Sequence, residues 1–188
     1  MTPDVAVFGW TETMMMTETM VAYHNDPTLK AAVLAQMAGH RADGTLIKGV
    51  YWAAGRGCAV GCLTHDPVGG HAQYPARWGI PEELARIEDG IFDHLPLEDA
   101  RAWPERFLAV IKPGADLSGV YAAWANTTAW AWAGMSESVL WQWMADRLIA
   151  SIKAAPATPE NGPTPDVDPM GDVVVGDQAL LVVDVPTP

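Results

Sequence analysis

The chain has 188 residues, a formal net charge of −12 and only two cysteines. That length suits one sizeable domain with its own core, and the excess negative charge argues against binding to nucleic-acid phosphates or anionic lipid. So few cysteines provide no disulfide framework, as is usual in a reducing cytoplasm, and MTPDVAVFGW has neither the basic start nor the apolar core of a secretory signal. The composition predicts a soluble cytoplasmic protein that binds neither nucleic acid nor membrane directly.

The first clear helix signal is NDPTLKAAVLAQMAGH, residues 25–40. Asp26 is placed to cap this helix, and Pro27 fits its first position. Apolar residues then recur at four-residue spacing as far as Met37, and a stop follows at Gly44. The next segment, TLIKGVYW, is expected to be a short strand or an irregular extended stretch.

The stretch GRGCAVGCLTH, residues 55–65, predicts a glycine-rich turn that leads into a short helix. Asp-Pro and Gly-Gly pairs end this helix, and a loop is expected from residue 66 to residue 79. Tyr74 and Trp78 lie in that loop, where they would cover a site or pack against the body.

The clearest helix is IPEELARIEDGIFDHL, residues 80–95, because Pro81 opens it and one apolar stripe runs along it. Glu88 lies next to that stripe. We expect it to form an ion pair rather than to act as a general acid or base, and its candidate partners are Arg56, Arg77 and Arg86. A short helix over 97–102 and a new turn from Pro104 should follow.

Residues 117–153 are rich in alanine and tryptophan and predict one long helix. Because its tryptophans lie on more than one face, other elements or a second subunit must enclose it. A Pro-rich linker is expected over 154–170, and a β-hairpin over 171–188. The predicted architecture is therefore mainly α, with one helical domain over 1–153, and a homo-oligomer would form through the Trp-rich helix or the hairpin.

The short cysteine-bearing helix is the main candidate for a binding site. The backbone amides at its start would point outward, and Arg56 beside them can bind phosphate oxygens in a forked geometry. A tryptophan ring would stack on a base. The sequence thus predicts binding of an anionic, nucleotide-like small molecule, although it contains no Walker or Rossmann motif. The expected ligand-binding residues are Trp52, Arg56, Gly57, Cys58, Ala59 and Trp103.

Other interpretations of the same stretch stay open. Cys58 at a helix start beside Arg56 would be the nucleophile of a cysteine-dependent enzyme. Two cysteines and two histidines would instead bind zinc, although their spacing is unusual for such a site. The glycines and cysteines would also suit tight packing alone, and the acidic surface would suit a protein-interaction inhibitor without a pocket. No cofactor is expected, and the alternative metal ligands are Cys58, Cys62, His65 and His71.

Several sequence motifs in this chain resemble those of a family of uncharacterised bacterial and phage or prophage proteins. They are GVYW at 49–52, GRGCAVGCLTH at 55–65, WGIPEELARIEDGIFDHLP at 78–96 and WPERFLAVIKPGADLS at 103–118. The resemblance covers under half of the chain, and it implies a mobile-element setting and a mainly helical body but no particular chemistry. By analogy with that setting, a small binding protein would act against host defence by sequestering a nucleotide signal.

Overall fold

The computed structural model describes residues 20–128 and 134–158, which belong to one compact unit that ends at Thr158. Seven α-helices dominate these residues, so the predicted mainly helical single domain is confirmed. The elements in chain order are η1 (Ala22–Asn25), α1 (Pro27–Ala42), β1 (Trp52–Ala53), β2 (Arg56–Gly57), α2 (Ala59–Thr64), η2 (His71–Gln73), α3 (Tyr74–Trp78), α4 (Glu82–His94), α5 (Leu97–Val110), α6 (Val120–Thr128) and α7 (Glu137–Lys153).

Helix α1 begins where the sequence predicts. The Asp26 side chain accepts a hydrogen bond from the Thr28 amide at 2.7 Å, and Pro27 occupies the first helical turn. Val33 and Met37 are buried, and α1 packs against α5. The predicted cap and apolar face are therefore confirmed.

Helices α4 and α5 form the centre of the core. Leu84 and Ile91 of the predicted stripe are completely buried, as are Trp103 and Phe107 of α5. Helix α5 continues through Pro104, so the new turn predicted there is wrong. The proline removes one backbone hydrogen bond, and burial of the side chains around it offsets that loss.

The single helix expected over 117–153 is also wrong, because two helices are present. Gly134 adopts a φ of 96°, and Ser136 takes an extended conformation before α7 begins. A left-handed backbone ends a helix and favours glycine. Helices α6 and α7 pack against each other, and Trp124 Nε1 donates a hydrogen bond to the Met144 carbonyl at 3.2 Å. The apolar faces of this segment thus cover one another.

Residues just after α7 pair with the segment before α6. The Asp116 amide donates to the Pro156 carbonyl, and the Thr158 amide donates to the Gly114 carbonyl, both at 2.8 Å. The first residues of the linker predicted over 154–170 therefore belong to the helical unit. The β-hairpin predicted over 171–188 lies outside the described residues.

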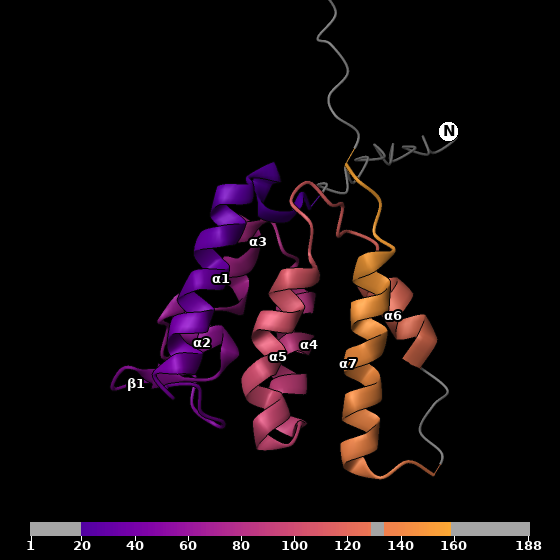
Figure 1. Ribbon diagram of the computed structural model, residues 1–188. Coiled ribbons are helices and arrows are strands. Elements are labelled where there is room, and N and C mark those ends of the chain that lie inside the picture. Colours follow the sequence, from indigo (N-terminus) through magenta and orange to yellow (C-terminus); the bar gives the residue numbers. More distant parts are fainter. Residues whose placement is uncertain (1–19, 129–133, 159–188) are drawn as a thin grey trace, which may run out of the picture. The chain divides into compact units, whose positions relative to one another are not determined.

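The helices stand side by side in Figure 1, where α5 lies between α1 and α7 and contacts both. Helix α4 packs against α5 and α7, and α2 packs against both α1 and α4. This arrangement brings the cysteine-bearing stretch against the middle of the molecule's clearest helix. Within the described ranges, no helix has both the length and the apolar character that a membrane crossing needs.

Candidate functional site

The cysteine-bearing stretch begins with a tight hairpin. Strands β1 and β2 pair antiparallel, and Ala54 and Gly55 between them have φ values of 49° and 77°. Two positive φ values characterise the type I′ turns that join such strands. Cys58 then caps α2, and its Sγ accepts a hydrogen bond from the Gly61 amide at 3.5 Å. The predicted turn into a short helix is confirmed, and the strand pairing adds to it.

Two glycines in this stretch make room for a backbone carbonyl. A Cβ on Gly57 would lie 1.9 Å from the Tyr51 carbonyl oxygen, and a Cβ on Gly61 would lie 1.4 Å from it. Cys62 is completely buried beside them, and its thiol donates to the Gly57 carbonyl at 3.4 Å. These small residues therefore serve the close packing of the preceding loop on α2.

Most of the backbone amides predicted to bind an anion already donate hydrogen bonds within the protein. The Gly57 amide donates to the Thr45 carbonyl at 3.1 Å, and the Cys58 amide donates to the Val50 carbonyl at 2.7 Å. Ala59 is completely buried, whereas the side chain of Arg56 is exposed on β2. Two of the three amides expected in the cradle are thus already paired within the protein.

The two tryptophans predicted to stack on a ligand have different surroundings. Trp52 is half-buried and stacks on His65 with 4.2 Å between the ring centroids. Trp103 is completely buried, and its Nε1 donates to the Glu88 carbonyl at 3.0 Å. Trp103 joins α5 to α4 inside the core, so it cannot stack on a ligand at the surface.

The four residues of the metal alternative do not converge. His65 packs on Trp52, His71 pairs with Asp89, and the Cys62 thiol donates to backbone carbonyls. Across residues 20–128 and 134–158, no group of three or more histidine, cysteine or acidic side chains is arranged to hold a metal ion.

A small pocket, here called the acidic pocket, opens beside Cys58. Its volume is about 210 Å³, and it lies between the loop that precedes β1 and helix α4. Asp93 is exposed, whereas Asp89 is only 7% exposed. The pocket is lined by Gly49, Val50, Tyr51, Cys58, Asp89 and Asp93.

Buried polar side chains gather around Asp89, which lines this pocket. The His71 Nε2 and Asp89 Oδ2 atoms are 3.1 Å apart. Three other side-chain atoms, Tyr74 Oη, Glu88 Oε2 and Asp89 Oδ1, are buried and have no hydrogen-bond partner among the described residues. Each such atom costs about 1–3 kcal/mol of stability. We call Cys58, His71, Tyr74, Glu88 and Asp89 the polar cluster.

The ion pair predicted for Glu88 is absent from the described structure. Of the three candidate partners, Arg77 donates to Gln73, Arg86 donates to Glu82, and Arg56 is exposed on β2. Glu88 itself is only 2% exposed. Its carboxyl group faces the interior because its helical position coincides with the apolar stripe of α4.

The protonation of the polar cluster follows from its burial. Burial, followed by the charges of Asp89 and Asp93, raises the pKa of Glu88 well above its ordinary value of 4.5. Burial and then Asp89 also raise the pKa of the Cys58 thiol, which keeps its proton at neutral pH. Only the thiolate is strongly nucleophilic, so the geometry does not support Cys58 as a nucleophile.

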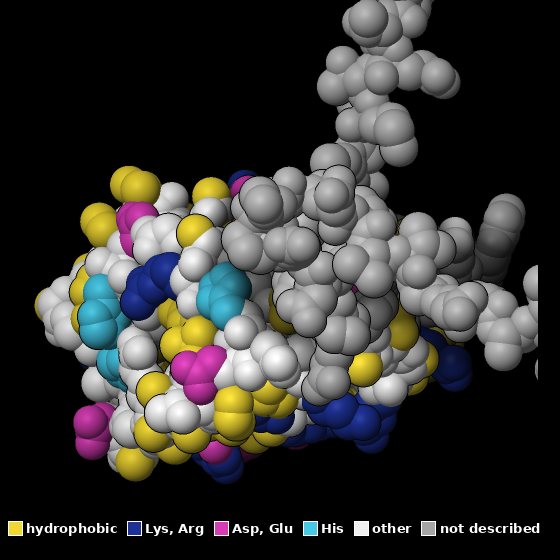
Figure 2. Space-filling view, turned by 90° about the horizontal axis from the view of Figure 1, so that it is seen from above, with side chains coloured by type: hydrophobic (Ala, Val, Ile, Leu, Met, Phe, Trp, Pro, Cys, Tyr) yellow, Lys and Arg dark blue, Asp and Glu magenta, His cyan; other side chains and the backbone are white. Residues whose placement is uncertain are grey.

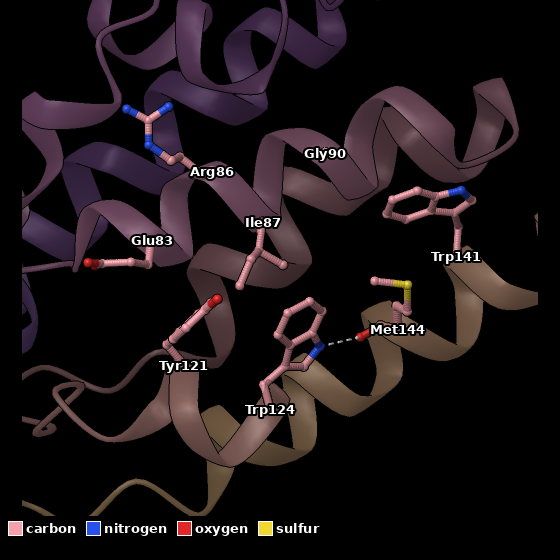
Figure 3. A pocket seen from close by; sticks show the side chains of 8 residues that line it. All are labelled: Glu83, Arg86, Ile87, Gly90, Tyr121, Trp124, Trp141 and Met144. Atoms are coloured by element: carbon pink, nitrogen blue, oxygen red, sulfur yellow. Dashed lines mark hydrogen bonds between the residues drawn. The ribbon is translucent and has the colours of Figure 1, made fainter. Parts of the chain in front are cut away.

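A second hollow, here called the aromatic groove, lies between α4, α6 and α7 (Figure 3). Its volume is about 340 Å³. Figure 3 shows two tryptophan rings and a tyrosine ring along one side and the backbone of α4 along the other. The groove is lined by Glu83, Arg86, Ile87, Gly90, Tyr121, Trp124, Trp141 and Met144.

Sequence reasoning missed most of the acidic pocket. Asp89 and Asp93 are four residues apart on a helix, and Asp89 follows Ala85 at the same spacing. That spacing places Asp89 beside a buried position, which is a signal that the sequence does contain. The sequence suggests His71 as an alternative zinc ligand and Tyr74 as a residue that would cover a site, but nothing in it predicts that both lie beside Asp89, because only the fold brings them there.

Comparison of the chain with protein-family models, with curated proteins and with solved structures finds no match.

Proposed function

We propose that the protein binds a small organic cation in the acidic pocket, with Asp89 as the principal anionic group. The observation that carries this proposal is a nearly buried carboxylate at the pocket wall, whose Oδ1 atom has no partner among the described residues. A buried carboxylate is stable only when donors or a positive charge satisfy it. A ligand that brings both would fill this need.

The charge of the pocket favours a cation over an anion. Asp89 and Asp93 both line it, and no lysine or arginine is among its lining residues. Lys48 lies nearby, but its Nζ donates to the backbone carbonyls of Asp93 and Leu95 at the end of α4. Two carboxylates in so small a space would repel a phosphate.

The size of the pocket limits the ligand. A volume of about 210 Å³ corresponds to roughly seven water-sized groups at about 30 Å³ each. A primary amine or a guanidinium on a short chain fits this volume. The amine would donate to Asp89, and Asp93 at the exposed side would attract it from solvent.

The remaining members of the polar cluster hold Asp89 in place. His71 Nε2 donates to Asp89 Oδ2, whereas the buried Oδ1 atom has no partner among the described residues. Burial, followed by the charge of Asp89, raises the pKa of Glu88, which disfavours a second negative charge beside Asp89.

The geometry of the pocket argues against two of the functions expected from the sequence. The paired amides and acidic walls argue against the nucleotide-like anion, and the protonated Cys58 thiol argues against the cysteine enzyme. On the face shown in Figure 2, acidic and basic side chains are scattered among apolar ones outside the grey region, so this visible part carries no continuous acidic patch. Sequestration in a phage setting is a further proposal, and a cationic ligand is compatible with it.

Calorimetric titration of the full chain tests the proposal. The probes are methylguanidine and ethylamine as small cations and AMP as the nucleotide. We expect saturable binding of at least one cation and none of AMP. Asp89→Asn should weaken the cation at least about tenfold, because it removes the charge and keeps the shape.

Asp99→Asn is the matched control, since it removes an exposed carboxylate from the first turn of α5. Its affinity for the cation should equal that of the wild type. Binding of AMP in preference to both cations, or unchanged cation affinity in Asp89→Asn, would overturn the proposal.

A further inference from the structure

Gly90 creates space in the floor of the aromatic groove. It lies inside helix α4, where a glycine costs about 0.5–1 kcal/mol relative to alanine. Close packing explains other glycines of this chain, such as Gly57 and Gly61, but a Cβ on Gly90 would meet nothing within 4 Å. The missing side chain therefore leaves open space that no neighbouring side chain uses.

The walls of the groove are aromatic rings in fixed positions. Trp124 Nε1 donates to the Met144 carbonyl, which holds the indole across α6 and α7. Trp141 stacks on His94 with 4.0 Å between the ring centroids and an angle of 18° between the planes. Figure 3 shows both indoles facing the stretch of α4 that carries Ile87 and Gly90. Rings that are held before binding lose little entropy when a ligand stacks on them.

One end of the groove carries a negative charge. Glu83 lines this end, opposite Trp141 in Figure 3, and no lysine or arginine of the described residues forms a salt bridge with it. Arg86 is bound to Glu82 on its own helix, and its guanidinium extends away from Ile87 in Figure 3. Glu83 is therefore the charged side chain at this end that forms no salt bridge within the described residues. Its carboxylate also extends away from the rings in Figure 3, so a cationic group would meet it at the rim of the groove.

We propose that the aromatic groove binds a planar aromatic compound that carries a positively charged group. The ring lies between Gly90 on one side and Trp124 and Trp141 on the other, and the cationic group lies towards Glu83. A volume of about 340 Å³ holds one fused ring system with a short side chain. This site is separate from the acidic pocket and does not depend on the function proposed for it.

Calorimetric titration of the full chain with three indoles tests this site. Tryptamine carries a cation, indole is neutral and indole-3-acetate is an anion, whereas the ring is the same. We expect affinity to fall in that order, and Glu83→Gln to bring tryptamine to the affinity of indole. Tryptamine should still bind Asp89→Asn, which separates this site from the acidic pocket.

Gly90→Leu fills the floor and should weaken tryptamine at least about tenfold. Gly39→Leu is its matched control, because Gly39 also lies inside a helix and has nothing within 4 Å of its Cβ position. Trp141→Ala, which removes a wall from the opposite helix, gives a second variant, and thermal melts check that each variant is folded. Absence of tryptamine binding to the wild type, or equal binding by Gly90→Leu and Gly39→Leu, would overturn the proposal.

Discussion

Glu88 shows how a single residue can oppose the stability of the fold. It occupies a helical position that the apolar stripe of α4 would otherwise fill, and its Oε2 atom is buried without a partner in the described structure. Burial raises the pKa of this carboxyl and so favours its protonated form, since an isolated charge in the core would cost far more than a neutral group. Stability given up at such a position is expected beside a functional site.

Replacing Glu88 by glutamine keeps its shape and removes its titration. The folded protein raises the pKa of Glu88 above 4.5, so the unfolded chain releases this proton first and the wild type loses stability as pH rises above that value. The Glu88→Gln variant has no carboxyl group at this position, so its stability does not fall with pH for this reason. Its advantage in free energy of unfolding should grow by about 1.4 kcal/mol per pH unit between pH 4.5 and the folded pKa.

Urea unfolding of both proteins from about pH 4 to about pH 8 measures this difference. Glu83→Gln serves as the control, because Glu83 is exposed on the same helix and solvent screens its charge. A difference between Glu88→Gln and the wild type that stays constant over this pH range would show that Glu88 is ionised in the folded protein.

At the scale of single elements, the two glycines of the cysteine-bearing stretch fix how the preceding loop meets α2. Tyr51, whose carbonyl enters the space that they leave, also lines the acidic pocket. The packing of one helix on one loop therefore sets the position of a pocket wall. Any side chain at Gly57 or Gly61 would displace that wall.

Gly61→Ala tests this close approach. Its Cβ would clash with the Tyr51 carbonyl, and overpacking of this kind costs about 1–3 kcal/mol or more, which exceeds the gain of about 1 kcal/mol in helix propensity. We expect the free energy of unfolding to fall and the affinity for the cation to fall with it. Gly39→Ala, where nothing lies within 4 Å, should instead stabilise by about 0.5–1 kcal/mol. Equal stability of the two variants, measured by urea unfolding, would contradict the close approach.

Helices with strong local signals could be predicted from the sequence, and those set by tertiary contacts could not. Helix α1 begins with a side-chain cap, α1 and α4 both carry a proline at their start and regular apolar spacing, and both form where expected. Residues 71–78 carry no such spacing, yet they form η2 and α3 because the core encloses Tyr74. The break near Gly134 was missed because alanine and tryptophan on both sides favour helix, and one glycine is a weak stop signal.

At the scale of the whole molecule, the candidate site was predicted only in part. Cys58, which the sequence predicts to bind a ligand, lines the acidic pocket, but its neighbours Asp89 and Asp93 come from a helix that begins more than twenty residues later in the chain. Spacing along a sequence cannot bring such residues together. Trp103 is predicted to stack on a ligand but is completely buried instead. The reason is the same, because only the packing of α5 on α4 decides which of the tryptophans are enclosed.

Trp103→Phe distinguishes a core residue from a ligand-binding one. The variant loses the hydrogen bond to the Glu88 carbonyl and leaves a small cavity in a completely buried position, so the free energy of unfolding should fall by about 2 kcal/mol. Trp143→Phe is the matched control, since Trp143 is half-buried on α7, and its cost should stay within about 0.5 kcal/mol. Urea unfolding measures both. Cation affinity should be the same in Trp103→Phe as in the wild type. Weakened binding without a loss of stability would instead indicate that Trp103 contacts the ligand, as the sequence suggests.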